Sequence, residues 1–265
     1  MRRMLCIGLL LATLTISASV RAETITIRAD EWLPYNGPST LRPAGYMIDL
    51  AMRIAKDHGH TIDYRHLPWD DALAAVKKGE FDCVVGANEE EAEGMVLPGL
   101  SWGSSQNVAY TLEGSKQVIG SIEAIKAKRL IYIPGYSYGE ELDPWIEQNA
   151  GNPAVVVPVT SGGRAAMSAI SKLVAKLGDV FVEDRNVIAH NLKQLDMVGR
   201  LKAQVVVDEE PTPIFIACTK ANLRGAQFTS MFEEGTRQLL RASGELGKIL
   251  EPYGLTDWES AQPEQ

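Results

Sequence analysis

Residues 67 to 87 read LPWDDALAAVKKGEFDCVVGA and contain a helix signal followed directly by a strand signal. Leu73 and Val76 recur at helical spacing, and Gly79 is the residue type that commonly ends a helix. The segment that follows, FDCVVGA at 81–87, is a continuous apolar run, which is typical of a strand buried in a parallel sheet. A helix that leads into a fully buried strand indicates an α/β fold.

The same alternation extends along the chain in both directions. Strands alternating with helices predict a mostly parallel sheet flanked by helices, and two such βαβαβ blocks predict two lobes. The expected strands are TITIRA (24–29), TIDYRHL (61–67), RLIYI (129–133), AVVVPV (154–159), DVFVED (179–184) and AQVVVD (203–208). The expected helices are GYMIDLAMRIAKDHG (45–59), SIEAIKAK (121–128), GEELDPWIEQ (139–148), GGRAAMSAISKLVAKLG (162–178) and NVIAHNLKQL (186–195).

Two joining segments set the expected domain boundaries. Residues 98–112 are rich in Gly and Ser, and residues 208–219 carry two prolines followed by a strand. If both segments cross between lobes, the second lobe is inserted into the first. We predict a signal peptide at 1–22, a first lobe formed by 23–108 and 214–265, and a second lobe at 109–213. Ligands of open α/β sheets bind at the carboxyl ends of strands, which would face each other across a cleft.

The N-terminus has the pattern of a secretory signal. Arg2 and Arg3 precede an apolar stretch of about a dozen residues, too short to span a bilayer, and Val20-Arg21-Ala22 resembles a cleavage site. We predict export to the periplasm with cleavage after Ala22 and no membrane insertion afterwards. Loss of the three arginines of this segment lowers the net charge from −8 to −11. An acidic protein repels phosphates, so nucleic acid is not an expected partner.

The cysteines and histidines do not predict a metal site. Cys83 and Cys218 both lie in apolar runs, so either a disulfide or two buried thiols fits the sequence. Neither has a C-x-x-C partner, and the histidines at 58, 60 and 66 span a helix end and a strand without convincing ligand spacing. We expect neither metal nor cofactor.

Five segments in order resemble a known family. They are ADEWLPYNG, GYMIDLAMRIAKDHG, LPWDDALAAVKKGEFDCVVGA, DVFVEDRNV and LRASGELGKILEPYGLTDW. Together they resemble the periplasmic solute-binding proteins of family 3, the amino-acid type that serves ABC importers. The resemblance covers essentially the whole chain after the signal. It implies a two-lobed type II periplasmic-binding-protein fold, a monomer that closes on a small molecule, and an ABC permease as partner.

One region departs from this family. Its amino-acid binders carry a Thr and an Arg after the FDCVVGA-type strand, and that Arg holds the ligand carboxylate. Here the region reads GANEEEAEG, with no arginine between Gly86 and Gly114. A standard α-amino acid is therefore disfavoured, and we take Asn88 and Glu89 as candidate ligand contacts. The acidic run is either a solvated helix face or an acidic lip that selects a cationic ligand.

The stretch GYSYG at 135–139 contains a G-x-S-x-G pattern, which admits three interpretations. Ser137 could be a hydrolase nucleophile, with Asp184 and His190 as later partners. It could instead belong to a loop that binds an anion through free N–H groups, or to a purely structural loop. His190 lies within an expected helix, which disfavours the hydrolase, so no catalytic residue is assigned.

The remaining candidate ligand contacts follow from the expected strand ends. Trp32 and Tyr35 follow the first strand and suit stacking or cation–π contact, although core packing explains Trp32 equally well. Trp69 fits packing better than ligand contact. Asp184 matches by resemblance the family aspartate that receives a ligand ammonium, and it also suits a helix N-cap. The full candidate set is Trp32, Tyr35, Trp69, Asn88, Glu89, Tyr136, Ser137, Tyr138 and Asp184.

The sequence thus predicts a binding protein that captures a small polar solute, amino-acid-like or an amine, and performs no chemistry. Two alternatives stay open. One is a periplasmic enzyme on the same fold, either a dehydratase or a hydrolase that uses Ser137. The other is a sensory or accessory protein that binds another periplasmic protein.

Overall fold

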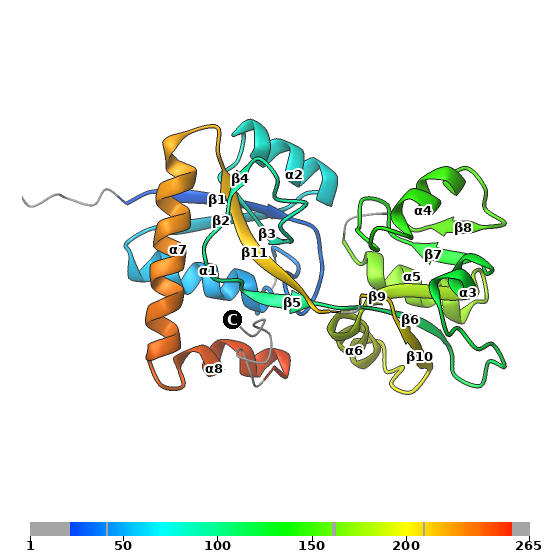
Figure 1. Cartoon of the computed structure of the whole chain (residues 1–265). Helices are drawn as coiled ribbons and strands as arrows, with labels where there is room; N and C mark the ends of the chain where they lie inside the picture. The colour runs from blue at the N-terminus through cyan, green and yellow to red at the C-terminus, as the bar shows by residue number, and fades with distance from the viewer. Residues whose placement is uncertain (1–21, 41, 161–162, 209, 256–265) are drawn as a thin grey trace, which may run out of the picture.

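The computed structural model describes residues 22–40, 42–160, 163–208 and 210–255. These residues form two lobes, each a sheet flanked by helices, which lie side by side in Figure 1. The predicted signal peptide, apart from Ala22, lies outside the described residues. Among the helices of the described segments, none combines the length and the apolar character that a membrane crossing needs.

The first lobe contains a sheet with strand order β2-β1-β3-β11-β4, and β5 pairs with β11 beside it. Strand β1 pairs in parallel with β2 and β3, whereas β11 runs antiparallel to β3, β4 and β5. The parallel pairs are those that helices connect, as βαβ units require. The strands are β1 (Thr24–Ala29), β2 (Thr61–His66), β3 (Cys83–Ala87), β4 (Met95–Val96), β5 (Gly103–Ser105) and β11 (Thr212–Thr219).

The helices of this lobe bury their apolar stripes against the sheet and against one another. Helix α2 ends where the sequence predicts, because Gly79 adopts a left-handed conformation at its C-cap. Helices α1, α7 and α8 contact each other, with α7 on the outer side in Figure 1. The bounds are α1 (Tyr46–Asp57), α2 (Trp69–Lys78), α7 (Leu223–Arg241), α8 (Glu245–Leu250) and the 3₁₀ turn η1 (Glu251–Tyr253).

The second lobe has the strand order β10-β6-β9-β7-β8 and a core on each face of the sheet. Successive side chains of a strand point to opposite faces. Accordingly, Ile131 and Phe181 belong to one apolar cluster, and Leu130 and Val180 to the other. The elements are β6 (Asn107–Leu112), α3 (Ile122–Lys126), β7 (Leu130–Tyr132), α4 (Asp143–Asn149), β8 (Val156–Pro158), α5 (Ala165–Val174), β9 (Val180–Asp184), α6 (Arg185–Gln194) and β10 (Leu201–Val206).

The first joining segment differs from its prediction in one respect. Its final part, NVAYTL, forms strand β6, which pairs antiparallel with both β9 and β10. The Gly and Ser residues that suggested a loop lie before this strand. The chain passes between the sheets from β5 to β6 and returns from β10 to β11. We propose the lobe boundaries at 108/109 and 213/214, which lie beside these passages, after the first two residues of β6 and of β11.

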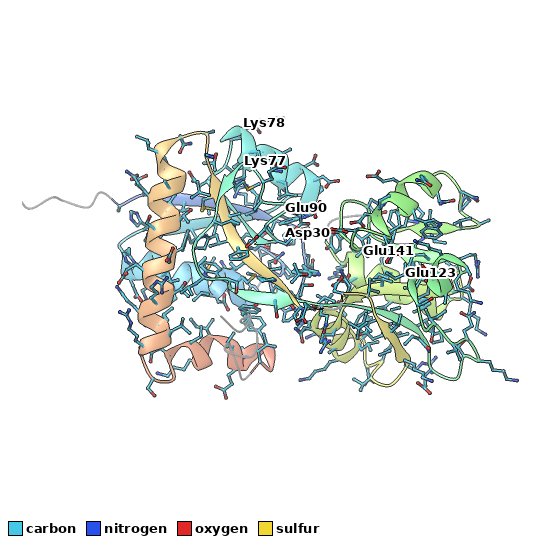
Figure 2. All side chains as sticks on the ribbon, in the orientation of Figure 1. Asp30, Lys77, Lys78, Glu90, Glu123 and Glu141 are labelled. Atoms are coloured by element: carbon cyan, nitrogen blue, oxygen red, sulfur yellow. A yellow bond between two sulfur atoms is a disulfide. The ribbon has the colours of Figure 1, made fainter. Side chains whose placement is uncertain are left out.

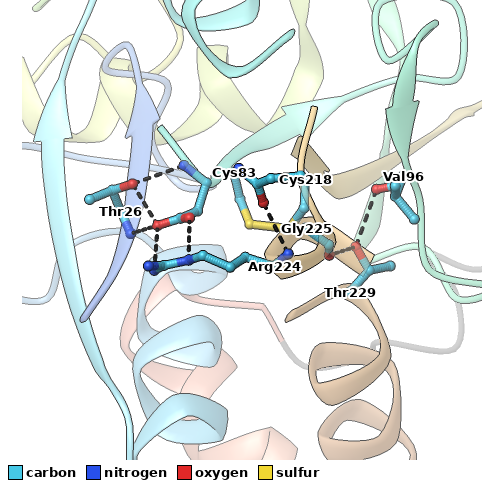
Figure 3. Close-up of a disulfide and its surroundings, with 9 residues drawn as sticks. Thr26, Cys83, Val96, Cys218, Arg224, Gly225 and Thr229 are labelled. Atoms are coloured by element: carbon cyan, nitrogen blue, oxygen red, sulfur yellow. Dashed lines mark hydrogen bonds and ion pairs between the residues drawn. A yellow bond between two sulfur atoms is a disulfide. The ribbon is translucent and has the colours of Figure 1, made fainter. Parts of the chain in front are cut away.

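A disulfide joins Cys83 and Cys218, so the structure contains the bonded alternative of the two that the sequence left open. The two residues are register partners on β3 and β11, with their Cα atoms 4.0 Å apart. Beside them, Arg224 Nε forms an ion pair of 3.2 Å with Asp82, whose Oδ2 also accepts hydrogen bonds from Thr26. Figure 3 shows that the disulfide lies against the start of helix α7. The return strand is thereby tied covalently to the first sheet.

Candidate functional site

A cavity of about 330 Å³ lies between the two lobes. Both lobes contribute to its wall, from the carboxyl ends of β1, β3 and β9 and from the loops that follow β3 and β7. Figure 2 shows Asp30 and Glu90 on the side of the first lobe that faces the second. The lining residues include Asp30, Trp32, Asn36, Trp69, Gly86, Asn88, Glu89, Glu90, Glu91, Tyr136, Ser137, Glu140, Glu183 and Asp208.

The charge of the wall has one sign. Seven lining residues carry carboxyl groups, and among the described residues that line the cavity none is Lys, Arg or His. Lys77 and Lys78, the basic pair of helix α2, lie at its outer end, away from the cavity (Figure 2). Walls of a single sign focus the electrostatic potential in a cleft. This cavity therefore repels anions and attracts cations.

Glu183 is the most deeply buried acid of the wall, with 2% of its surface exposed. Its Oε1 accepts hydrogen bonds from Trp32 Nε1, at 3.1 Å, and from the backbone N–H of Asp184, at 2.9 Å. Its Oε2 is buried and has no hydrogen-bond partner among the described residues. Burial raises the pKa of Glu183 to about 8, and the nearby charges of Asp184 and Asp30 act in the same direction.

Asn36 presents a second buried acceptor. Its side-chain Nδ2 donates to the backbone carbonyl of Asp30 at 2.7 Å, which fixes the amide so that Oδ1 is the free end. Oδ1 is buried and has no partner among the described residues. A Cβ at Gly86 would lie 3.4 Å from this oxygen and 3.5 Å from the benzo edge of Trp32. Glycine at position 86 thus leaves room beside both groups.

Asp30 and Tyr136 meet across the cleft. Asp30 follows strand β1 in the first lobe, and the Tyr136 hydroxyl of the second lobe donates a hydrogen bond to its Oδ2. Burial raises the pKa of Asp30 to about 6, although the bond from Tyr136 acts in the opposite direction. This contact and the Trp32–Glu183 bond connect the lobes, so the structure is a closed form.

Asp184 does not line the cavity, contrary to its proposed ligand role. It is fully buried, and its Oδ1 caps helix α6 by accepting from the N–H groups of Asn186 and Val187. Tyr35 Oη also donates to Oδ1, and the Gln106 N–H donates to Oδ2. Its lone pairs are already used by the protein. Neighbouring residues of a strand point in opposite directions, and Glu183 is the one that faces the cavity.

The GYSYG loop is not a free anion site. The Ser137 hydroxyl donates to Asp143 Oδ2 at 3.0 Å, and the Tyr138 N–H donates to Asp143 Oδ1 at 2.7 Å. The carboxylate of Asp143 thus occupies the position expected for a ligand anion. The hydroxyl that a hydrolase would activate is bonded to a carboxylate rather than to His190. Ser137 still lines the cavity, whereas Tyr138 is buried in the core of the second lobe.

The candidates from the first lobe separate into two groups. Trp32, Trp69, Asn88 and Glu89 line the cavity, and their contact with a ligand stays a prediction. Tyr35 does not line it, because its ring is buried and stacks on Trp32 with centroids 4.2 Å apart. Trp32 packs on the core and also borders the cleft, so its packing role is confirmed while its contact with a ligand stays a prediction.

The acidic run after β3 forms turns rather than a helix. Asn88 Oδ1 accepts from the Glu91 N–H at 2.8 Å, and Glu91 Oε2 accepts from the Asn88 N–H at 3.0 Å. Glu91 Oε1 accepts from Trp69 Nε1 at 2.9 Å, and burial raises the pKa of Glu91. Glu89 and Glu90 are exposed at the rim. The interpretation as a solvated helix face is wrong, and the run borders the cleft.

Sequence reasoning missed several lining residues. Asp30 directly follows the first strand, and Glu183 is an acid that follows three apolar residues within a strand, so both carried a signal of function in their position. Asn36 carried no such signal, because its role depends on a turn in which Trp32 and Asn36 pair as an isolated bridge. The missed polar lining residues include Asp30, Asn36, Glu90, Glu91, Ser105, Asn107, Glu140, Glu183 and Asp208.

The inserted second lobe, the two mixed sheets and the cavity between them define a type II periplasmic-binding-protein-like fold. The chain belongs to the bacterial extracellular solute-binding proteins, family 3, whose family model matches residues 25–256. No curated protein matches the chain at a significant level.

Solved structures share this fold at low sequence identity. A histidine kinase sensor domain with similarity to periplasmic binding proteins has a TM-score of 0.71 at 19% identity, covering 88% of this chain and 96% of that one. An ABC uptake transporter substrate-binding protein from Streptococcus pneumoniae with bound histidine has 0.71 at 19%, covering 91% and 95%. An ancestral arginine-binding protein bound to arginine has 0.69 at 20%, covering 87% and 97%. These likenesses concern the fold alone.

Proposed function

We propose that this protein captures a small solute in the cleft between its lobes and delivers it to an ABC importer without chemical change. The observation that carries the proposal is the cavity itself, which is walled by strand ends of both sheets and closed by hydrogen bonds between the lobes. Ligand that fits such a cleft is removed from water when the lobes close, and closure gives the importer a shape to recognise.

Export is part of the same proposal. The protein would be directed to the periplasm by residues 1–22, cut after Ala22, and act there as a monomer. The intact mass of the protein recovered from a periplasmic extract tests the cleavage site directly. A protein whose mass includes residues 1–22 would contradict the cleavage site.

A thermal-shift screen with amino acids, amines, sugars and organic acids tests the binding function. A ligand that binds only the folded state raises the melting temperature, because it stabilises that state by mass action. We expect one class of compound to raise it, and chromatography of the mixture to return the compound unchanged. Turnover of the compound would point to an enzyme. A complete absence of shifts would favour the accessory-protein alternative.

A further inference from the structure

The cleft has two buried acceptors and no basic group in its described wall. We propose that its ligand is an organic cation with at least two N–H-bearing groups and no carboxylate, such as a diamine or an amino-guanidine, held by Glu183 and Asn36. This inference rests on the proposed solute-binding function and names the class of ligand. It differs from an α-amino acid, whose carboxylate would enter a wall of seven acidic residues without a cationic partner.

The two unpartnered oxygens carry the inference. Glu183 and Asn36 are 2% and 1% exposed, yet each keeps one buried oxygen without a hydrogen-bond donor among the described residues. Native proteins seldom leave buried polar atoms unpaired, and such atoms commonly mark a site that a ligand completes. An amide oxygen only accepts hydrogen bonds. At least at Asn36, the missing group must therefore be a donor.

The positions of the two oxygens indicate a ligand with two donors. Glu183 is bonded to the Nε1 edge of the Trp32 indole, whereas Asn36 Oδ1 lies beside Gly86, next to the opposite benzo edge. One ligand that reaches both oxygens spans the width of the indole ring. An aliphatic chain between two amines would lie along that ring, with apolar and cation–π contact.

The buried acids favour a cation once they ionise. Burial raises the pKa of Glu183 to about 8, so at neutral pH the closed form without ligand keeps this proton. The titratable groups that interact with its charge are the carboxyl groups of Asp184 and Asp30 and the hydroxyls of Tyr136, Tyr138 and Tyr110. None of these is positive, so an ammonium group would replace the proton and bind more tightly as pH rises.

A metal ion is a poorer occupant than an organic cation. Among the described residues, no group of three or more His, Cys, Asp or Glu side chains is arranged to hold a metal. The acids of the wall come from several separate segments of the chain, and three of them accept hydrogen bonds from Trp32, Tyr136 and Trp69. Dispersed acceptors suit a ligand that carries several separated donors.

Calorimetric titration with a four-carbon series tests the inference on the whole protein. The probes are 1,4-diaminobutane, agmatine, 1,4-butanediol, succinate and arginine, which differ mainly in their charged ends. We expect diaminobutane or agmatine to bind at least tenfold more tightly than the diol, succinate and arginine. Affinity should increase from pH 6 to pH 9, and binding at pH 7 should release protons, seen as a heat that depends on the buffer.

Glu183→Gln removes the charge with little change in shape, and we expect it to weaken binding of the cation at least tenfold. The matched control is Glu93→Gln. Glu93 is an exposed acid of the acidic run after β3, and it does not line the cavity. That variant should stay within twofold of the wild type. Melting of each variant without ligand verifies folding, and the probe series on the wild-type protein needs no variant.

The outcomes separate the two proposals. If succinate or arginine binds and neither cation does, the ligand class is wrong, while capture of a solute stands. If both cations fail at millimolar concentration, the ligand class is also overturned, whatever the broader screen finds. Tighter binding of the cation at low pH than at high pH would contradict the role of an ionised Glu183.

Discussion

At the scale of the residue, Glu183 concentrates the physical chemistry of the cleft. Its carboxyl group is almost fully buried at the end of β9 and accepts hydrogen bonds through one oxygen only. An ionised carboxylate loses hydration on burial, which is why its pKa is raised from 4.5 to about 8. Protonation of Glu183 avoids the free-energy cost of burying an ionised carboxylate when the cleft closes without ligand. A bound cation would offset the same cost by pairing with the ionised carboxylate.

This pKa predicts how stability depends on pH. The unfolded chain releases the Glu183 proton near pH 4.5, whereas the folded protein keeps it up to about pH 8. The folded state therefore binds more protons in that window, and stability decreases as pH rises through it, by about 1 kcal/mol per pH unit from this group. Urea unfolding of the wild type and of Glu183→Gln at pH 5, 6, 7 and 8 measures the slope.

Comparing the wild type with Glu183→Gln also controls for the other groups that titrate in this pH range. Asp30, with a pKa raised to about 6, acts in the same direction, and His190, with a pKa lowered by burial, acts in the opposite one. Both are present in the wild type and in Glu183→Gln, so the difference in slope reports Glu183 together with its coupling to Asp30 and Asp184. We expect the variant to be the more stable protein at pH 8. Equal slopes for the two proteins would show that Glu183 does not hold its proton.

At the scale of the element, close approach of a helix to a strand explains one glycine. Helix α7 starts directly after β11, and a Cβ on Gly225 would lie 1.7 Å from the backbone oxygen of Thr219. Figure 3 shows this first turn beside the disulfide. Any side chain at position 225 must push the helix away from the strand that carries Cys218.

Gly225→Ala should therefore destabilise the protein by about 2 kcal/mol or more, the usual cost of overpacking a rigid contact. Gly247→Ala is the matched control, because Gly247 also lies in a helix but a Cβ there would meet no atom within 4 Å. Alanine favours helix by up to about 1 kcal/mol over glycine, so the control should be neutral or more stable. Denaturant midpoints measure both. A Gly225→Ala protein as stable as the wild type would contradict the close contact.

The elements differ in how far sequence alone could predict them. Leu73, Val76 and Gly79 act locally, through helical spacing and a left-handed cap, so α2 and its end could be predicted. Strand β6 could not, because its place depends on pairing with β9 and β10, which lie far along the chain. The disulfide could not be predicted for the same reason, because only the register of β3 with β11 brings its two cysteines together.

The candidate site was predictable in location but not in every residue. The expected strand ends, and the absence of the family arginine in GANEEEAEG, pointed to the edge of the sheets where the cavity lies. Resemblance pointed to Asp184, whereas Glu183 lines the cavity, because motif resemblance does not show which side chain of a strand faces the cleft. The interpretation of GYSYG as an anion-binding loop could not be tested from the sequence for a similar reason. The N–H of Tyr138 donates to Asp143, a residue of the helix that follows the loop.

At the scale of the whole molecule, closure involves hydrogen bonds between the lobes and apolar packing, since Ala166 and Val187 of the second lobe join the core cluster of the first. Hydrogen bonds between the segment after β1 and the second lobe include those of Trp32 with Glu183, Tyr35 with Asp184 and Asn186, and Asp30 with Tyr136. Tyr35 and Asp184 are buried near the passages between the lobes, so their hydrogen bond is expected to persist when the cleft opens. The bonds of Trp32 and Asp30 border the cavity and would break when the cleft opens.

Tyr136→Phe removes the hydroxyl that bonds to Asp30 and keeps the ring, so it should shift the ligand-free protein towards an open form. Hydrogen bonds to charged groups contribute about 1.5–3 kcal/mol, enough to change the ratio of closed to open molecules by about tenfold or more. Small-angle X-ray scattering without ligand should give a larger radius of gyration than the wild type. The control is Tyr64→Phe, which removes a hydroxyl that donates to Gly37 within the first lobe. If Tyr136→Phe scatters like Tyr64→Phe and the wild type, the bond between Asp30 and Tyr136 does not control closure.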